Sequence, residues 1–337
     1  MERGRGQERG GAVRICVLAA CAASACGPTA EAGGQAVGVL PAAPYGDLDT
    51  LVRDLFIPGA DSNAYVAPKP TELASFQSIV AMISSRAFDA AKERAAGLGY
   101  ELWHLDDPNA AGLVVLVENS VASRGGGTYV FDVAADPTRV IEVPHPIADV
   151  GTLSEGVQLF KQAHAGALLI AGTHRCASLA STSCLGADTT NACAGRLRMS
   201  DAAHFDGSYF HRVHEALFRL WPASHAVSLH AHADSVGQPD LTLSAGTRAD
   251  VAPDALPNLV RDGLRAAGFT ASSCNTASDP APRLCGESNV QGRASNGAAD
   301  ACLGDAARTG ERFLHVEQSA TALSAPAPLV AALAGLL

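Results

Sequence analysis

Residues 140–171 read VIEVPHPIADVGTLSEGVQLFKQAHAGALLIA, and this stretch decides the predicted fold. A short apolar strand at 140–143 precedes a helical pattern at 153–163, which is followed by a continuous apolar strand at 167–171. Two consecutive strands joined by a helix run parallel, and the helix covers one face of their sheet. The stretch therefore predicts an α/β protein.

The same alternation continues along the chain in both directions. Three closely spaced strands come before residue 140, which predicts that the sheet begins antiparallel. Strands then alternate with helices, which predicts a largely parallel sheet covered on both faces. We expect one domain over residues 46–337, with helices at 71–98, 210–220, 256–267 and 328–337 and further strands at 100–105, 113–118, 128–133, 226–229 and 313–316.

The length and charge of the chain limit the classes of protein to which it can belong. The chain has 337 residues, 47% of them hydrophobic, which is ample for a sizeable core. Lys and Arg total 24 against 34 for Asp and Glu, and no basic stripe occurs. We therefore expect no nucleic-acid partner.

The first residues have the composition of a targeting segment. Four arginines precede the apolar run Ile15–Ala25, so residues 1–26 are predicted to be an export signal. Leu18-Ala19-Ala20-Cys21 is typical of a lipoprotein signal, with Cys26 as a second candidate for lipidation and simple secretion as a third outcome. A start codon placed too early is the competing interpretation. The run is shorter than the roughly 20 residues of a membrane span, and residues 27–45 are predicted to be a flexible linker.

Six cysteines remain beyond the leader. Their even number in an exported chain predicts disulfides. They form two clusters of three, so at least one bridge must join the clusters if all six pair. The cysteines are Cys176, Cys184 and Cys193, and Cys274, Cys285 and Cys302.

Polar side chains gather at the ends of three predicted strands. The segments are VIEVPHPIAD (140–149), VSLHAHAD (227–234) and FLHVE (313–317). Ligands of open α/β sheets bind at the carboxyl ends of strands, where loops from distant segments converge. These three segments are therefore expected to form one site.

The residue types in these segments predict a zinc hydrolase site. His145, Asp149 and His232 would supply two nitrogen ligands and one oxygen ligand, leaving a position open for water. Zinc acidifies such a water and polarises a carbonyl group. Glu317 suits the general base, which takes the proton of the water and passes it to the leaving amine.

Several assignments stay open at this point. Asp149 could cap the following helix, with Glu155 as the carboxylate ligand instead. His230 and His232 share one face of their strand, so either could be the ligand.

Three further side chains have candidate roles near the substrate. Arg175 is a candidate for stabilising an oxyanion. Arg293 is a candidate for binding a substrate carboxylate, and Asn289 in the same segment is a candidate substrate-binding residue. For both arginines, a structural ion pair is the competing interpretation.

The strand-end motifs resemble those of a known family. Val143-Pro-His145, Val227-Ser-Leu-His-Ala-His232, residues 239–246 and Leu314-His-Val-Glu317 are similar to segments of N-formylglutamate amidohydrolase-like proteins and, more distantly, of zinc carboxypeptidases. The resemblance spans about residues 140–322. It implies a three-layer α/β/α fold of the zinc exopeptidase type with a mixed, mainly parallel sheet, one Zn²⁺, and cleavage of an amide next to a carboxylate.

Two departures from the family pattern concern the metal ligands. Ala148 occupies the position of the carboxypeptidases' acidic ligand, and Asp149 is one residue further on. His230 stands where, in this alignment of motifs, the amidohydrolases place Asp. The carboxylate ligand and the substrate therefore stay open.

Together these observations predict an exported zinc-dependent amidohydrolase or carboxypeptidase, located in the cell envelope or secreted. Its substrate would be a small N-acyl amino acid or a peptide. The alternative is a non-catalytic envelope binding protein that retains the hydrolase fold, and a third hypothesis is metal storage. Glu317 discriminates between the enzyme and the binding protein, because a binding protein does not need a carboxylate beside the metal. Oligomeric state and disulfide connectivity are left open.

Overall fold

The computed structural model describes residues 40–337 except 122, 136, 186–191, 236 and 280–282. All described residues fall within one compact unit, Gly34–Leu337. The predicted leader and residues 27–39 of the predicted linker lie outside the described residues. The last linker residues contact the sheet, since Ala43 N donates to His104 O at 2.7 Å.

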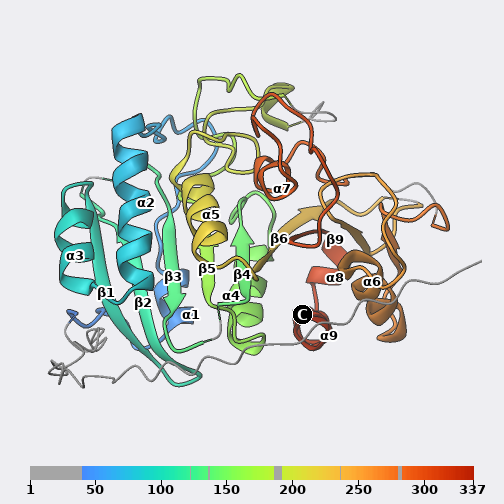
Figure 1. Cartoon of the computed structure of the whole chain (residues 1–337), viewed down its shortest axis with the longest axis horizontal. Helices are drawn as coiled ribbons and strands as arrows, with labels where there is room; N and C mark the ends of the chain where they lie inside the picture. The colour runs from blue at the N-terminus through green and yellow to red at the C-terminus, as the bar shows by residue number, and fades with distance from the viewer. Residues whose placement is uncertain (1–39, 122, 136, 186–191, 236, 280–282) are drawn as a thin grey trace, which may run out of the picture. The chain divides into compact units, whose positions relative to one another are not determined.

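The centre of this unit is a nine-stranded mixed sheet (Figure 1). The strand order is β1-β2-β3-β5-β4-β6-β9-β7-β8. The strands are β1 Tyr100–Asp107, β2 Ala110–Glu118, β3 Thr128–Asp132, β4 Arg139–Val143, β5 Ala167–Ile170, β6 His225–His232, β7 Leu241–Ser244, β8 Ala271–Ser273 and β9 Phe313–Ser319. Strands β5, β4, β6 and β9 form a parallel centre, and β1, β2 and β3 pair antiparallel at one edge, as predicted.

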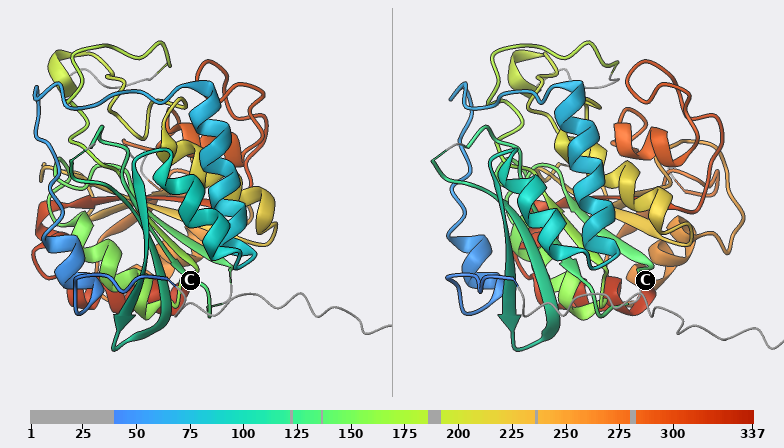
Figure 2. Two further views of the ribbon diagram at one scale, coloured as in Figure 1. Left: turned by 90° about the vertical axis from the view of Figure 1, so that its left-hand side faces the viewer. Right: turned by 60° about the vertical axis from the view of Figure 1, so that its left-hand side comes forward.

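Helices cover both faces of the sheet, which gives the predicted three layers (Figure 2). One apolar core lies between the sheet and α1, α4, α6, α8 and α9. The other lies between the sheet and α2, α3 and α5. The helices are α1 Leu48–Arg53, α2 Pro70–Ser84, α3 Phe88–Ala96, α4 Thr152–Gln162, α5 Tyr209–Leu220, α6 Leu256–Ala266, α7 Val290–Ser295, α8 Ala320–Leu323 and α9 Pro326–Leu336.

The long helix predicted at 71–98 is two helices in the structure. Helix α2 ends at Ser84 and α3 begins at Phe88. Arg86 lies between them with φ of 59°, in the left-handed region, where a helix cannot continue. Apolar spacing did not reveal this break, because the buried faces of both helices follow the same 3.6-residue period.

A close contact between α4 and β4 positions the loop that carries His145 and Asp149. A Cβ on Gly156 would lie 2.5 Å from Val143 Cγ2, so only glycine allows this approach. The turn before α4 also needs glycine, since Gly151 at the N-cap has φ of 101°. The side chain of Asp149 is therefore not the cap of α4.

Three disulfides link the loops around the carboxyl ends of the central strands. They join Cys176 to Cys193, Cys184 to Cys302 and Cys274 to Cys285. The second spans 118 residues and joins the two cysteine clusters, as predicted. None of the helices described here is long and apolar enough to span a membrane.

Candidate metal centre

The candidate site lies where β4, β6 and β9 end. Glu142 on β4 pairs with Ser228 on β6, so His145, three residues beyond Glu142, lies level with Ala231, between His230 and His232. On the other side of β6, His230 pairs directly with Glu317 of β9. Neighbouring residues of paired strands present their side chains on one face of a sheet. The register thus brings His230 and Glu317 together, and the contacts of Asp149 with both rings place His145 beside His230.

Three potential ligand atoms converge at this place. Asp149 Oδ2 lies 3.0 Å from His145 Nδ1 and 3.3 Å from His230 Nδ1. All three side chains are buried, and their donor atoms lie within 4.8 Å of one another. Two imidazole nitrogens and one carboxylate oxygen make up a donor set that suits zinc.

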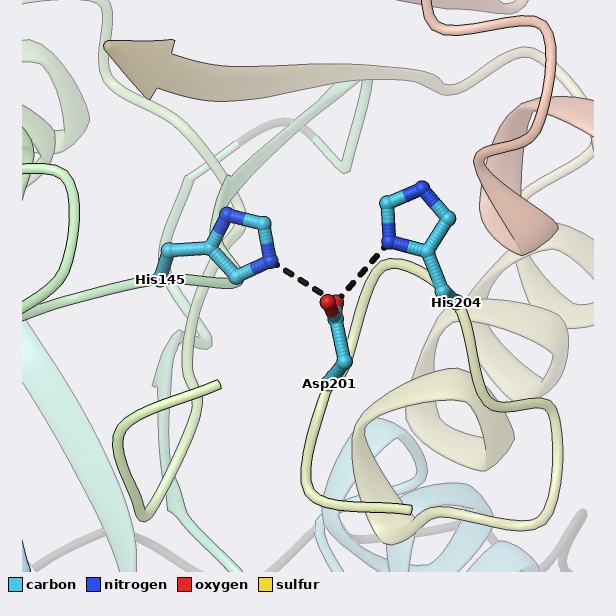
Figure 3. A group of neighbouring side chains, drawn as sticks. All are labelled: His145, Asp201 and His204. Carbon is cyan, nitrogen blue, oxygen red and sulfur yellow. Dashed lines mark hydrogen bonds and ion pairs between the residues drawn. The ribbon is translucent and has the colours of Figure 1, made fainter. Parts of the chain in front are cut away.

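The opposite nitrogen of each imidazole is also bound. His145 Nε2 lies 2.9 Å from Asp201 Oδ1, and His230 Nε2 lies 3.2 Å from Ser228 Oγ. Figure 3 shows Asp201 between the rings of His145 and His204, whose Nδ1 lies 3.0 Å from Asp201 Oδ1. Hydrogen bonds to the far nitrogen fix the tautomer and the orientation of a metal-binding histidine.

The site has a defined charge distribution. Burial opposes ionisation of Asp149, but His145 and His230 hold the pKa of that carboxyl well below its usual range. Burial also opposes ionisation of Asp201, while Arg175, His204 and His145 keep its pKa well below the ordinary value.

The pKa values of the two histidines beside Asp149 shift in opposite directions. Burial lowers the pKa of His230 to about 4, with the nearby His315 adding to the effect. A neutral His230 ring has a lone pair free for a metal. For His145, burial and Arg175 act against protonation, but Asp149 and Asp201 outweigh them and raise its pKa.

His232, a candidate ligand from the sequence, is not part of this cluster. Its Nδ1 lies 3.0 Å from Ala233 O, and the ring is partly exposed. Both histidines point to one face of β6, but His232 lies two residues, roughly 6.6 Å, further along the strand. The contact of His230 Nδ1 with Asp149 Oδ2 therefore selects His230.

Glu155, the alternative carboxylate, does not join the ligand atoms either. It is fully buried on α4, where its Oε2 accepts a hydrogen bond from Gln318 Nε2 at 2.7 Å. Burial raises the pKa of Glu155 to about 8. The structure favours Asp149 as the carboxylate of the cluster.

Glu317 faces the cluster from β9. Its Oε1 lies 3.6 Å from His315 Nε2. Its Oε2 is buried and has no hydrogen-bond partner among the described residues. A buried carboxylate oxygen without a partner is costly, so its placement beside the potential ligands is informative.

The arginine and asparagine candidates divide between two environments. Arg175 lies at the site and holds Asp201 Oδ2 through Nε at 3.1 Å and Nη2 at 2.9 Å. Arg293 instead donates to the backbone oxygens of Glu287 and Leu185, both at 2.9 Å. Asn289 caps α7 by accepting a hydrogen bond from Gly292 N. These contacts give Arg293 and Asn289 structural roles.

Other groups near the ligands were not predicted from the sequence. They are Asp201, His204, Ser228 and His315. Asp201 and His204 lie in a loop without a strand before it, so no pattern in the sequence marked them. Among the described residues, two further clusters could geometrically hold a metal. In one, Asp201 is already paired with Arg175; in the other, the sulfurs of Cys184 and Cys302 are joined in a disulfide.

The chain was also compared with known proteins. No family model matches the chain, and no curated protein matches it. An N-formylglutamate amidohydrolase from Ralstonia eutropha JMP134 is similar over 63% of this chain and 95% of that one, with 16% identity and a TM-score of 0.38. A bacteriophage poly-gamma-glutamate hydrolase is similar over 60% and 84%, with 14% identity and a TM-score of 0.35. The first of these carries the name of the family that the motifs resemble.

Proposed function

We infer that the protein is a zinc-dependent hydrolase that cleaves an amide bond. His145 Nδ1, His230 Nδ1 and Asp149 Oδ2 would hold the metal. The observation that carries this proposal is the convergence of these three atoms while the opposite ring nitrogens are bound by Asp201 and Ser228. That combination of a ligand set and supporting hydrogen bonds is typical of catalytic zinc sites.

Bound zinc would supply Lewis acidity, which polarises a carbonyl group and lowers the pKa of a water molecule to about 7. The chain itself handles the protons. Glu317 pairs with His230 across β6 and β9, and its unpaired Oε2 is free to take a proton from the attacking water. It would then pass that proton to the leaving nitrogen.

Arg175 is placed to act on the negative charge that develops on the carbonyl oxygen. Its guanidinium forms an ion pair with Asp201 and is attracted by the negative charges of Asp149 and Glu317. These interactions fix it at the site. A donor that is already oriented needs no reorganisation during the reaction. Asp201 therefore has two positioning tasks, one for His145 and one for Arg175.

The substrate class follows from the motif resemblance, which implies a carboxylate-bearing N-acyl amino acid or peptide. The buried, unpaired Glu317 favours an enzyme over a binding protein that retains the fold. Binding alone would leave the cost of burying this carboxylate uncompensated.

Export to an oxidising compartment is part of the proposal. The composition of residues 1–26 supports it, with a lipid anchor at Cys21 or Cys26 as one form. Three disulfides in the described part of the chain also support it, because such bridges persist in oxidising compartments.

The test combines metal analysis with one substitution. The purified protein should contain about one zinc per chain and should hydrolyse a member of a panel of N-acyl amino acids and short peptides. Glu317→Gln should keep the metal but lose roughly a hundredfold to ten-thousandfold in turnover, as expected for a lost general base. Glu101→Gln, a strand carboxylate on β1 at the far edge of the sheet, is the matched control and should retain full activity. Full activity of Glu317→Gln would refute the mechanism.

A further inference from the structure

A second group of side chains has the geometry of a serine nucleophile with its base. It comprises Ser295 at the end of α7, His214 on α5 and Glu142 on β4. His214 Nε2 lies 3.0 Å from Ser295 Oγ, and His214 Nδ1 lies 2.6 Å from Glu142 Oε1. This order of hydroxyl, imidazole and carboxylate is the arrangement that activates serine hydroxyls in hydrolases on unrelated folds.

The imidazole is held in one orientation. Glu142 is fully buried and His214 is 1% exposed. The ring of Phe218 stacks on His214 at a centroid distance of 4.2 Å. A buried carboxylate on Nδ1 keeps Nε2 facing the hydroxyl as a proton acceptor and stabilises the imidazolium that forms. Ser295 is less enclosed, with 8% of its surface exposed.

Ser295 and His214 line a cavity of about 220 Å³. Its other lining residues include three arginines, Arg219, Arg308 and Arg312. The one acidic residue in the lining, Glu215, is bound by Arg212 at 2.6 Å.

The arginines leave an excess of positive charge in this cavity. Within the described ranges, Arg312 donates only to backbone oxygens and the Ser224 hydroxyl, and it lies 4.3 Å over the ring of Phe218. For Arg219 and Arg308 there is no ion pair with any carboxylate in the part of the chain described. Guanidinium groups bind carboxylates through charge-assisted hydrogen bonds.

We propose that Ser295, His214 and Glu142 form a second, metal-independent acyl-transfer site for small esters that carry a carboxylate. Ser295 Oγ attacks the ester carbonyl carbon while its proton moves to His214 Nε2. The ester C–O bond then breaks, and the departing alkoxide takes the proton from His214. Water hydrolyses the resulting acyl-Ser295 by the same proton path, so one ester and one water give one acid and one alcohol.

This site shares no residue with the proposed zinc site, so chelation separates the two. The full-length protein is treated with EDTA and then with a fluorophosphonate, and the modified peptide is identified by mass spectrometry. We expect an adduct on Ser295. This measurement needs no variant, and an unmodified Ser295 in folded protein would overturn the proposal.

Turnover is measured next with mono-p-nitrophenyl succinate and p-nitrophenyl acetate, again in EDTA. Ser295→Ala should abolish the release of p-nitrophenol above background. Glu142→Gln, which is isosteric, should slow it by about 10⁴-fold, the effect of removing the charge that orients the base. Ser288→Ala is the matched control, since Ser288 Oγ also lies 3.1 Å from a histidine nitrogen, on His204; it should leave release unchanged.

The arginines set the expected preference between the two esters. The succinate ester should have the higher kcat/KM, by roughly tenfold to a hundredfold for one charge-assisted hydrogen bond. Arg308→Ala should reduce that preference without changing hydrolysis of the acetate ester. Equal release by Ser295→Ala and the parent would refute the site, while a Ser295 adduct without preference for the succinate ester would refute the assigned substrate class.

Discussion

Glu155 offers a measurement that tests the structure without knowledge of the substrate. Its carboxyl is completely buried, and its single hydrogen bond comes from a neutral group, the amide of Gln318. Its Oε1 has no partner among the residues that the structure describes. Burial therefore raises its pKa from 4.5 to about 8, and the folded protein holds Glu155 protonated at neutral pH.

The free energy of unfolding depends on pH because the folded and unfolded states bind the proton of Glu155 differently. Between pH 4.5 and about 8 the unfolded chain has lost the proton of Glu155 and the folded chain retains it. Raising the pH therefore favours the unfolded state and lowers the free energy of unfolding. At about 1.36 kcal/mol per pH unit, a difference of about 3.5 units amounts to about 5 kcal/mol, fully expressed above pH 8.

Glu155→Gln removes the titration and keeps the shape of the side chain. Its free energy of unfolding relative to the parent should rise by about 1.4 kcal/mol for each pH unit above 4.5 and level off near pH 8. Urea unfolding followed by circular dichroism from pH 5 to 9 measures this, with disulfides intact and EDTA present to exclude stabilisation by metal.

Glu93→Gln, an exposed change on α3, is the control and should show no such rise. A difference between Glu155→Gln and the parent that stays constant with pH would refute the assignment of a buried, protonated carboxyl.

Three further outcomes test the ligands and the cross-links. His230→Ala should lose zinc, whereas His232→Ala should retain it, as measured by elemental analysis of dialysed protein. The reverse result would make His232 the ligand in place of His230. Replacing both cysteines of Cys184–Cys302 by serine should lower the free energy of unfolding by about 5 kcal/mol, more than the roughly 3 kcal/mol for Cys274–Cys285, because the longer bridge restricts the unfolded chain more. Thiol titration of the denatured, non-reduced mature chain should find none of the six cysteines beyond the leader free.

The sequence by itself determined the layers of the fold. The runs at 140–143, 167–171, 226–229 and 313–316, each with at most one polar residue, all became central parallel strands, because strands buried on both faces are nearly continuous in apolar residues. The helix boundary at Arg86 was not predicted, because it depends on a backbone conformation and not on the pattern of apolar residues. The short strands β7 and β8 were missed, since three or four residues carry too little periodicity to detect.

For the site, the sequence determined the strand ends but not which side chains meet. His145, Asp149 and Glu317 became candidates because polar residues after apolar runs are unusual. The choice between His230 and His232 was beyond the sequence. A strand has a period of two residues, so both side chains point to the same face. The tertiary contacts decide between them, because His230 pairs with Glu317 and contacts Asp149, whereas His232 does neither.

The supporting groups were decided by tertiary structure alone. Asp201 reaches His145 across 56 residues of chain, and Ser295 reaches His214 across 81. No local pattern encodes such contacts, because they depend on where separate loops and helices pack. The sequence thus determined the secondary structure and the edge of the sheet that carries the chemistry. Strand register and loop packing decided which atoms converge there.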